Sequence, residues 1–313
     1  MPGTWAHNEK VPGTFTLRKI MTMFRGTWPA LVTPFTDENT VNIAVVRDLV
    51  EYLLSKQVDG FYVCGRTGQG LSMSVAERQL IAETVMTQVR ERVPVVVHVG
   101  SMSIQDALIL TRHAAQIGAS GISSIIPPYY AEMPQIVGYF QAVANAAPHL
   151  PFFPYLFGFP KVVELMQSLL VTLPNVMGTK YTGPDMYEFQ QVVNLRQENW
   201  YIFSGMDEQC LFARMSGATG SIGSTMNFMP RAYRNIHACF EQGKLAEAME
   251  WQQKANKVTE TLQTYRFMSG MIEVMRLLGF DCGSLRLPDF PLSAEDREKL
   301  RGDLQTIAFD QLT

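Results

Sequence analysis

The sequence predicts an α/β protein, a (β/α)₈ or TIM barrel with a helical extension at its carboxyl end. Short apolar runs alternate with longer segments whose apolar residues recur every three or four positions, a pattern typical of parallel strands joined by helices. Eight such units follow one another over about two hundred residues, which fits a closed barrel. A doubly wound open sheet is the structural alternative, but no GxGxxG follows the first strand.

The predicted elements are bounded by glycine, proline and polar residues. The strands are expected at residues 27–32, 60–64, 94–99, 121–126, 151–156, 176–180, 201–205 and 218–222. The helices between them are expected at residues 41–56, 75–92, 104–116, 134–147, 162–170, 185–196 and 208–215. Ser74 and Ser103 are expected to cap two helices at their N-termini, and Gly118 to end one.

After residue 227 the pattern becomes helical, with segments at 230–242, 245–262, 265–278 and one beginning at Ser293. No linker rich in Pro, Gly or Ser precedes them, so we expect them to pack on the barrel. The predicted organisation is an N-terminal extension (1–24), expected to be flexible, a barrel (25–229) and C-terminal helices (230–313).

Composition and charge narrow the class of partner. A net charge of -3 and a pI near 6.0 provide no basic field for nucleic acid or a membrane surface, so a small molecule is the expected partner. No apolar run reaches bilayer length, and the opening residues lack the apolar stretch of a secretory signal. The four cysteines are scattered, without histidines at metal-ligand spacing; disulfides and zinc are not expected, and the cytoplasm is the expected location.

Polar residues follow several predicted strands at their carboxyl ends, where barrel enzymes carry their chemistry. The glycine-rich loop 65–70 after the second strand can offer backbone N–H groups to an anion. Tyr155 ends the fifth strand, Lys180 the sixth, and Asp207 and Glu208 follow the seventh. A lysine partly stripped of water favours the neutral amine, which can attack a ketone to form a Schiff base.

Each of these features also has a purely structural interpretation. Lys180 could reach solvent along its aliphatic stem, Tyr155 could be a core residue, and the paired acids could simply begin a helix. These interpretations are independent, so they do not predict that all the groups fall at the same end of neighbouring strands. The co-location therefore favours a site. His98, by contrast, is expected to be a core or rim histidine.

Four motifs give the chain a resemblance to the pyruvate-dependent class I aldolases, the family that includes N-acetylneuraminate lyase and dihydrodipicolinate synthase. The resemblance runs from about Phe24 to the C-terminus. The segment GTWPALVTPF (26–35) resembles the family's first strand, Gly65-x-Thr67-Gly68 its carboxylate-binding loop, Gly178-x-Lys180 its Schiff-base strand, and Tyr155 its catalytic tyrosine.

The lyase branch of the family is the closer match. Residues 205–209 and 217–227 are similar to lyase segments that hydrogen-bond a sugar's hydroxyls, whereas 156–161 lacks the arginine that the synthase branch carries there. The chain departs from the family at Arg66, where a small proton-relaying hydroxyl residue is usual, and at Gln69, where Glu is usual. A guanidinium can bind a carboxylate in a fork but cannot relay a proton at neutral pH.

The resemblance implies Lys180 and Tyr155 as catalytic residues, no metal, and no cofactor beyond the covalent imine. It implies these substrate-binding residues: Arg66, Thr67, Gly68, Tyr130, Thr182, Gly205, Asp207, Glu208, Gly223 and Ser224. Tyr130 corresponds to a residue that approaches from a neighbouring subunit, which implies a homo-oligomer, with a tetramer favoured.

The implied function is reversible cleavage of N-acetylneuraminate, or a related 2-keto-3-deoxy sugar acid, to pyruvate and an aldehyde. Two alternatives stay open at this point. One is dihydrodipicolinate synthase activity, which condenses pyruvate with aspartate semialdehyde. The other is a barrel that binds a keto acid without turning it over.

Overall fold

Eight parallel strands form a closed barrel in the computed structural model, which describes residues 23–313. The strands are β1 (Gly26–Pro29), β2 (Phe61–Val63), β3 (Val95–His98), β4 (Gly121–Ile125), β5 (Phe152–Phe157), β6 (Gly178–Thr182), β7 (Tyr201–Ser204) and β8 (Gly220–Gly223). Each strand pairs with the next, and β1 pairs with β8. A bridge between Ala30 and Tyr62 joins β1 to β2. The predicted barrel is therefore confirmed.

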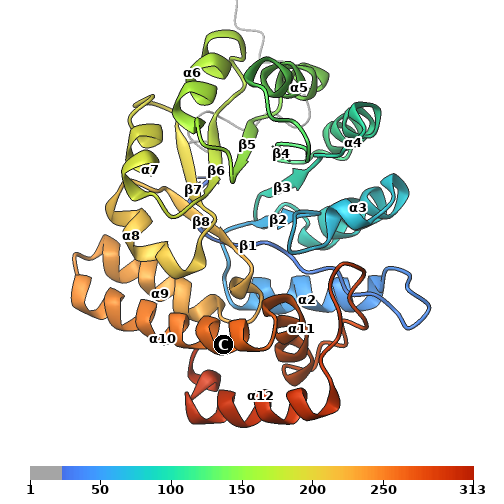
Figure 1. Ribbon diagram of the computed structural model, residues 1–313, viewed down its shortest axis with the longest axis vertical. Coiled ribbons are helices and arrows are strands. Elements are labelled where there is room, and N and C mark those ends of the chain that lie inside the picture. The colour runs from blue at the N-terminus through green and yellow to red at the C-terminus, as the bar shows by residue number, and fades with distance from the viewer. Residues whose placement is uncertain (1–22) are drawn as a thin grey trace, which may run out of the picture.

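A ring of helices surrounds the strands (Figure 1). These helices are α2 (Ile43–Ser55), α3 (Val75–Val89), α4 (Ile104–Gln116), α5 (Met133–Ala146), α6 (Val162–Thr172), α7 (Met186–Val193), α8 (Cys210–Met215) and α9 (Pro230–Glu241). The predicted caps are confirmed: Ser74 accepts a hydrogen bond from the Glu77 N–H, and Ser103 accepts one from the Asp106 N–H. Gly118, with φ of +76°, follows α4.

Aromatic side chains fill the interior of the barrel and form its floor. The rings of Trp28 and Phe203 lie 5.2 Å apart, and those of Phe153 and Phe203 lie 5.8 Å apart. Phe24, which the sequence analysis placed in the N-terminal extension, is fully buried in this floor, with its ring 4.9 Å from that of Phe153. The barrel thus includes Phe24, and residues 1–22 of the expected extension lie outside the described residues.

The boundary between the barrel and the C-terminal helices also differs from the one expected from the sequence. Helix α9 follows β8 and packs against β1 and α8, so it is the eighth helix of the barrel rather than part of the extension. The helices that follow are α10 (Leu245–Thr264), α11 (Phe267–Leu277) and α12 (Ala294–Thr306), and α10 lies along α9 (Figure 1). Within residues 23–313, no helix combines the length and apolar character needed to cross a membrane.

Replacing Phe24 by Ala should lower the free energy of unfolding by about 3–5 kcal/mol, because it leaves a cavity in a closely packed aromatic floor. Chemical denaturation measures the change. Val171→Ala is the control, because Val171 is 85% exposed on α6, and it should change stability by less than about 0.5 kcal/mol. Equal, small losses in both variants would contradict a structural role for Phe24.

Candidate active site

Lys180 lies in the middle of β6, whereas the sequence analysis placed it at a strand end. It pairs with Tyr155 on β5 and with Phe203 on β7. Its side chain is only 4% exposed, and its Nζ lies 4.3 Å from the centre of the Tyr155 ring and 4.6 Å from that of Tyr62. The faces of aromatic rings attract a cationic amine, so these two rings hold the lysine head above the aromatic floor.

The two tyrosines beside Lys180 differ in their hydrogen bonding. Tyr155 is 3% exposed, and its hydroxyl forms no hydrogen bond within residues 23–313, so it is available to a ligand. The hydroxyl of Tyr62 donates to Ser123 Oγ at 3.0 Å, and burial raises the pKa of this phenol well above its usual value. The sequence analysis missed Tyr62. Tyr62 could have been found from the sequence, because a tyrosine within a predicted buried strand needs a hydrogen-bond partner for its hydroxyl.

His98 is a structural residue, as expected. Its Nδ1 lies 3.1 Å from the Cys64 carbonyl oxygen, and its Nε2 accepts a hydrogen bond from the Ile125 N–H at 3.0 Å. Burial, and then the charge of Arg78, hold the pKa of this imidazole well below its usual value. Arg78 in turn donates to the carbonyls of His98 and Gly100. The neutral ring thus ties the ends of β2, β3 and β4 together.

The loop after β2 is held from two sides. The hydroxyls of Thr67 and Ser224 lie 2.7 Å apart, which joins this loop to the one after β8. Thr33 donates to the Gly68 carbonyl at 2.8 Å. A side chain at Gly68 would bring a Cβ within 2.7 Å of the Leu31 carbonyl oxygen, so only glycine fits. Two predicted binding residues, from opposite parts of the chain, therefore meet here.

Arg66 and Tyr130 lie at the rim rather than beside the lysine. The exposed guanidinium of Arg66 lies 4.8 Å above the ring of Phe157, at the end of β5, and has no carboxylate partner within residues 23–313. Tyr130 is half-buried, with its ring 5.4 Å from that of Tyr139. No hydrogen bond or ring contact in the described chain joins Tyr130 to Lys180.

Asp207 places a buried carboxyl beside the loop that follows β8. Its Oδ2 accepts hydrogen bonds from the N–H and the hydroxyl of Thr225, both at 2.8 Å. Burial raises the pKa of this carboxyl to about 6; the charge of Glu208 acts in the same direction, and the bonds from Thr225 and the charge of Lys180 oppose it. The group therefore titrates near neutral pH.

Two glycines make room for two unpaired oxygens. A Cβ at Gly205 would lie 1.8 Å from Thr182 Oγ1, and one at Gly223 would lie 1.6 Å from Asp207 Oδ1. Both oxygens are buried and have no hydrogen-bond partner within the described residues. Because buried polar atoms are nearly always hydrogen-bonded, these two oxygens are exceptions among the described residues, and each packs closely against a glycine.

No three His, Cys, Asp or Glu side chains within residues 23–313 gather in a way that could hold a metal ion. All four cysteines are free thiols. A closed barrel with a buried lysine and an unengaged tyrosine in its mouth defines a class of protein suited to covalent chemistry on carbonyl compounds.

Comparison with known proteins places the chain within one family. The model of the Dihydrodipicolinate synthetase family matches residues 23–307, and the chain belongs to this family. N-acetylneuraminate lyase of Mus musculus is 33% identical over 299 residues, which cover 91% of this chain and 93% of that protein. The predicted membership is confirmed, on the lyase branch.

Solved structures of N-acetylneuraminate lyases, also called sialic acid aldolases, are likewise similar to this chain. Proteus mirabilis N-acetylneuraminate lyase has a TM-score of 0.87 and 30% identity, covering 92% of this chain and 99% of that one. A catalytic lysine mutant of Ruminococcus gnavus sialic acid aldolase has a TM-score of 0.89 and 27% identity, covering 96% of this chain and 100% of that one.

The Asp207→Asn variant should gain stability over the wild type as pH rises. A carboxyl whose pKa is raised by folding favours the folded state when protonated, and this advantage is lost as pH rises from the unfolded-state pKa through about 6. Between pH 4.5 and 7.5 the variant should therefore gain about 2 kcal/mol relative to the wild type. Denaturant unfolding of both proteins at pH 4.5 and 7.5 measures this difference in the free energy of unfolding. Asp37→Asn, at an exposed site, should show no such trend; a parallel trend in both variants would contradict the assignment.

Proposed function

We propose that this chain is a lyase that cleaves N-acetylneuraminate, or a related 2-keto-3-deoxy sugar acid, reversibly to pyruvate and an aldehyde. The observation that carries the proposal is the buried amine of Lys180 beside the ring of Tyr155 in the barrel mouth. The relatives named N-acetylneuraminate lyase support the substrate, and the similar aldolase that has a catalytic lysine supports the mechanism.

The first step is formation of a Schiff base. The Lys180 amine attacks the keto carbon of the substrate, and the oxygen of that carbon leaves as water, so a protonated imine remains. Tyr155, whose hydroxyl is not engaged by the protein, exchanges the protons that this dehydration requires. The imine draws electrons toward its nitrogen, and this pull replaces a metal or an organic cofactor.

The second step breaks the carbon–carbon bond. A base removes the proton from the hydroxyl two carbons beyond the imine carbon, and this hydroxyl carbon becomes the aldehyde as its bond to the carbon between them breaks. The electron pair of that bond moves to the imine and leaves an enamine. Protonation of the enamine carbon and hydrolysis of the imine then release pyruvate and regenerate the free lysine.

The substrate's carboxylate belongs on the side of the mouth formed by the loop after β2. The Thr67 hydroxyl and the backbone N–H groups of residues 65–68 can hold it, because fixed donors stabilise an anion without reorganising. The guanidinium of Arg66 is a further anion-binding group on this side, free of any carboxylate in the described chain.

The polyol portion of the substrate belongs beside the loops that follow β7 and β8. Thr182 and Asp207 each carry an oxygen without a hydrogen-bond partner in the described chain, so we expect these two side chains to hydrogen-bond its hydroxyl groups. Glu208, on the loop after β7, adds a carboxylate, and Ser224, on the loop after β8, adds a hydroxyl where this side meets Thr67 of the carboxylate loop. A polyhydroxylated aldehyde needs such a set of groups, whereas a simple keto acid does not.

Two further proposals concern assembly and location. We propose a homo-oligomer, a tetramer, in which the Tyr130 segment approaches the site of a neighbouring subunit; the adjacent Tyr129, with φ of +70° and 94% of its surface exposed, is consistent with this. We propose the cytoplasm as the compartment, since the four cysteines are free thiols.

Incubation with pyruvate and borohydride should attach a reduced pyruvate to Lys180 alone, because hydride traps the imine. Mass spectrometry of the digested protein locates the adduct. Lys180→Ala should lose both the adduct and sialic acid cleavage while it keeps the wild-type melting temperature. Lys254→Ala, an exposed lysine on α10, should behave as the wild type. Full activity in Lys180→Ala would falsify the mechanism, and condensation of pyruvate with aspartate semialdehyde in place of cleavage would reassign the substrate.

Replacing Tyr155 by Phe should slow cleavage by roughly 10²-fold or more, since it removes a proton carrier but keeps the ring beside the lysine. The loss should appear in kcat, with little change in KM. Steady-state pyruvate release measures both. Tyr187→Phe, at an exposed position on α7, should leave both constants unchanged. An unaltered kcat in Tyr155→Phe would remove Tyr155 from the proton-transfer role.

A further inference from the structure

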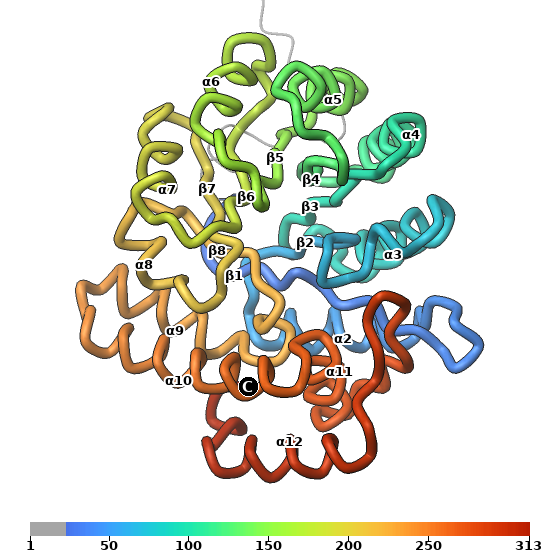
Figure 2. The backbone as a smooth tube through the Cα atoms, viewed as in Figure 1, coloured from blue at the N-terminus to red at the C-terminus, as the bar shows by residue number. Residues whose placement is uncertain are grey.

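The segment 282–290, between α11 and α12, runs beside the loop after β2; we call it the C-terminal strap. Figure 2 shows this dark red segment beside α3 and the blue loop that precedes α2. Its backbone is tied to the N-terminal part of the barrel, because the Phe35 N–H donates to the Cys282 carbonyl at 3.0 Å. Ser72 also donates to the carbonyl of Leu287.

Gln69 connects the strap to the loop that carries Thr67. Its Nε2 donates to the Arg286 carbonyl at 2.9 Å and to Asp289 Oδ2 at 3.3 Å, while its Oε1 accepts from the Arg286 N–H at 3.3 Å. Gln69 is only 7% exposed and has φ of +52°, a left-handed conformation that is uncommon outside glycine. The side-chain contacts therefore hold a backbone geometry that the loop does not prefer by itself.

Arg286 fixes the strap in turn to the start of α3. Its guanidinium forms a fork with the Glu77 carboxylate, at 2.6 and 3.1 Å, and lies 4.1 Å above the ring of Phe35. It also donates to the carbonyl and side-chain oxygens of Asn39. The hydrogen bond from Arg286 lowers the pKa of Glu77 to about 2, so this pair stays charged throughout the neutral range.

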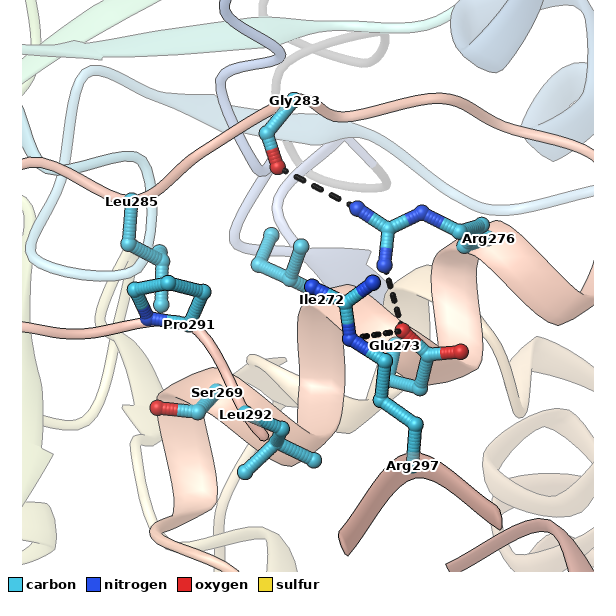
Figure 3. A pocket seen from close by; sticks show the side chains of 9 residues that line it. All are labelled: Ser269, Ile272, Glu273, Arg276, Gly283, Leu285, Pro291, Leu292 and Arg297. Atoms are coloured by element: carbon cyan, nitrogen blue, oxygen red, sulfur yellow. Dashed lines mark hydrogen bonds and ion pairs between the residues drawn. The ribbon is translucent and has the colours of Figure 1, made fainter. Parts of the chain in front are cut away.

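Both ends of the strap are anchored as well, and Figure 3 shows the contact at Gly283. Arg276 donates to the Gly283 carbonyl, and Ser269 donates to the Phe290 carbonyl. Glu273 is paired with Arg276 and Arg297 (Figure 3). The cavity among these residues is about 10 Å³, no more than the space of one water molecule. The strap is therefore closely packed against α11 on this side, whereas its residues 284–287 line an open hollow on the side of Thr36 and Ser72.

The partners of Gln69 explain why this position holds an amide. Two of them are oxygen atoms that accept hydrogen bonds, one belonging to the Asp289 carboxylate, and the third is an N–H that donates. Only an amide can donate to the first two and accept from the third. A glutamate would set a second negative charge against Asp289 and leave the Arg286 carbonyl without its donor.

We propose that Gln69 is a positioning residue for the keto acid's carboxylate. Three consecutive residues of the loop are held by different elements: Thr67 by Ser224, Gly68 by Thr33, and Gln69 by the strap. Loss of the hydrogen bonds between Gln69 and the strap would let the loop move. The hydrogen-bond donors at Thr67 and Gly68 would then no longer keep a fixed orientation toward the carboxylate. The strap thus sets the affinity for the keto acid without touching it. This inference rests on the proposed function, because it takes this loop as the carboxylate site.

The test is the pyruvate concentration that gives half-maximal borohydride trapping on Lys180. Gln69→Glu should raise this half-saturating concentration about tenfold and leave the maximal extent of trapping unchanged. This result would show that the substitution weakens binding of pyruvate but not imine formation. Adding Asp289→Asn to that variant should bring the rise to within about threefold of the wild type, because the repelling charge is gone. Asp289→Asn alone is the matched control and should stay within twofold, since its amide oxygen can still accept from Gln69. Arg286→Lys, which breaks the fork with Glu77, should raise the value about threefold.

Each result decides one question. A half-saturating concentration within twofold of the wild type in Gln69→Glu overturns the inference. A rise that Asp289→Asn does not reduce, together with an unchanged value in Arg286→Lys, also overturns it, because the new charge would then act on the site without the strap. Should Gln69→Glu not fold, an unchanged value in Arg286→Lys overturns it instead. If the wild-type protein traps no pyruvate, the proposed function fails, and this outcome is distinct from the others.

Discussion

The mouth of this barrel depends on one unusual placement, an amine buried in the middle of a strand. Lys180 has aromatic floor beneath it and the rings of Tyr62 and Tyr155 beside it. Such a side chain is costly to desolvate unless its neighbours compensate, and here ring faces do so in place of a carboxylate partner. Within residues 23–313 the amine is therefore held in position without an ion pair that would block its access to a carbonyl carbon.

The charges around Lys180 are divided between two sides of the mouth. Arg66 follows β2, and the buried Arg78, on α3, donates to carbonyl groups at the end of β3. Neither arginine pairs with a carboxylate in the described chain. Asp207 and Glu208 follow β7, which β8 and β1 separate from β2 around the barrel. A substrate that carries a carboxylate at one end and hydroxyl groups at the other matches this division. Under the proposed function, this division would orient the ligand before any covalent bond forms.

The sequence was sufficient for features that depend on local patterns and insufficient for those that depend on distant contacts. Alternating apolar runs predicted all eight strands, and Ser74 and Ser103 predicted their caps, because these signals lie within a few residues. The contact between Gln69 and Arg286 joins positions 217 residues apart, and no local pattern reports it. Phe24 was missed because the apolar residues just before it, Ile20, Met21 and Met23, show no periodicity that says which of them is buried.

Helix α10 has a consequence for the boundaries of the working unit. Gln252 donates to the Asp207 carbonyl and accepts from the Leu211 N–H, and Asn256 donates to the Glu208 carbonyl. The loop that bears both acids is thus braced from behind by a helix that follows the last strand. Anyone transplanting this mouth onto another scaffold would have to carry α10 along with it, since eight strands and their loops alone would arrive with the acidic wall unsupported.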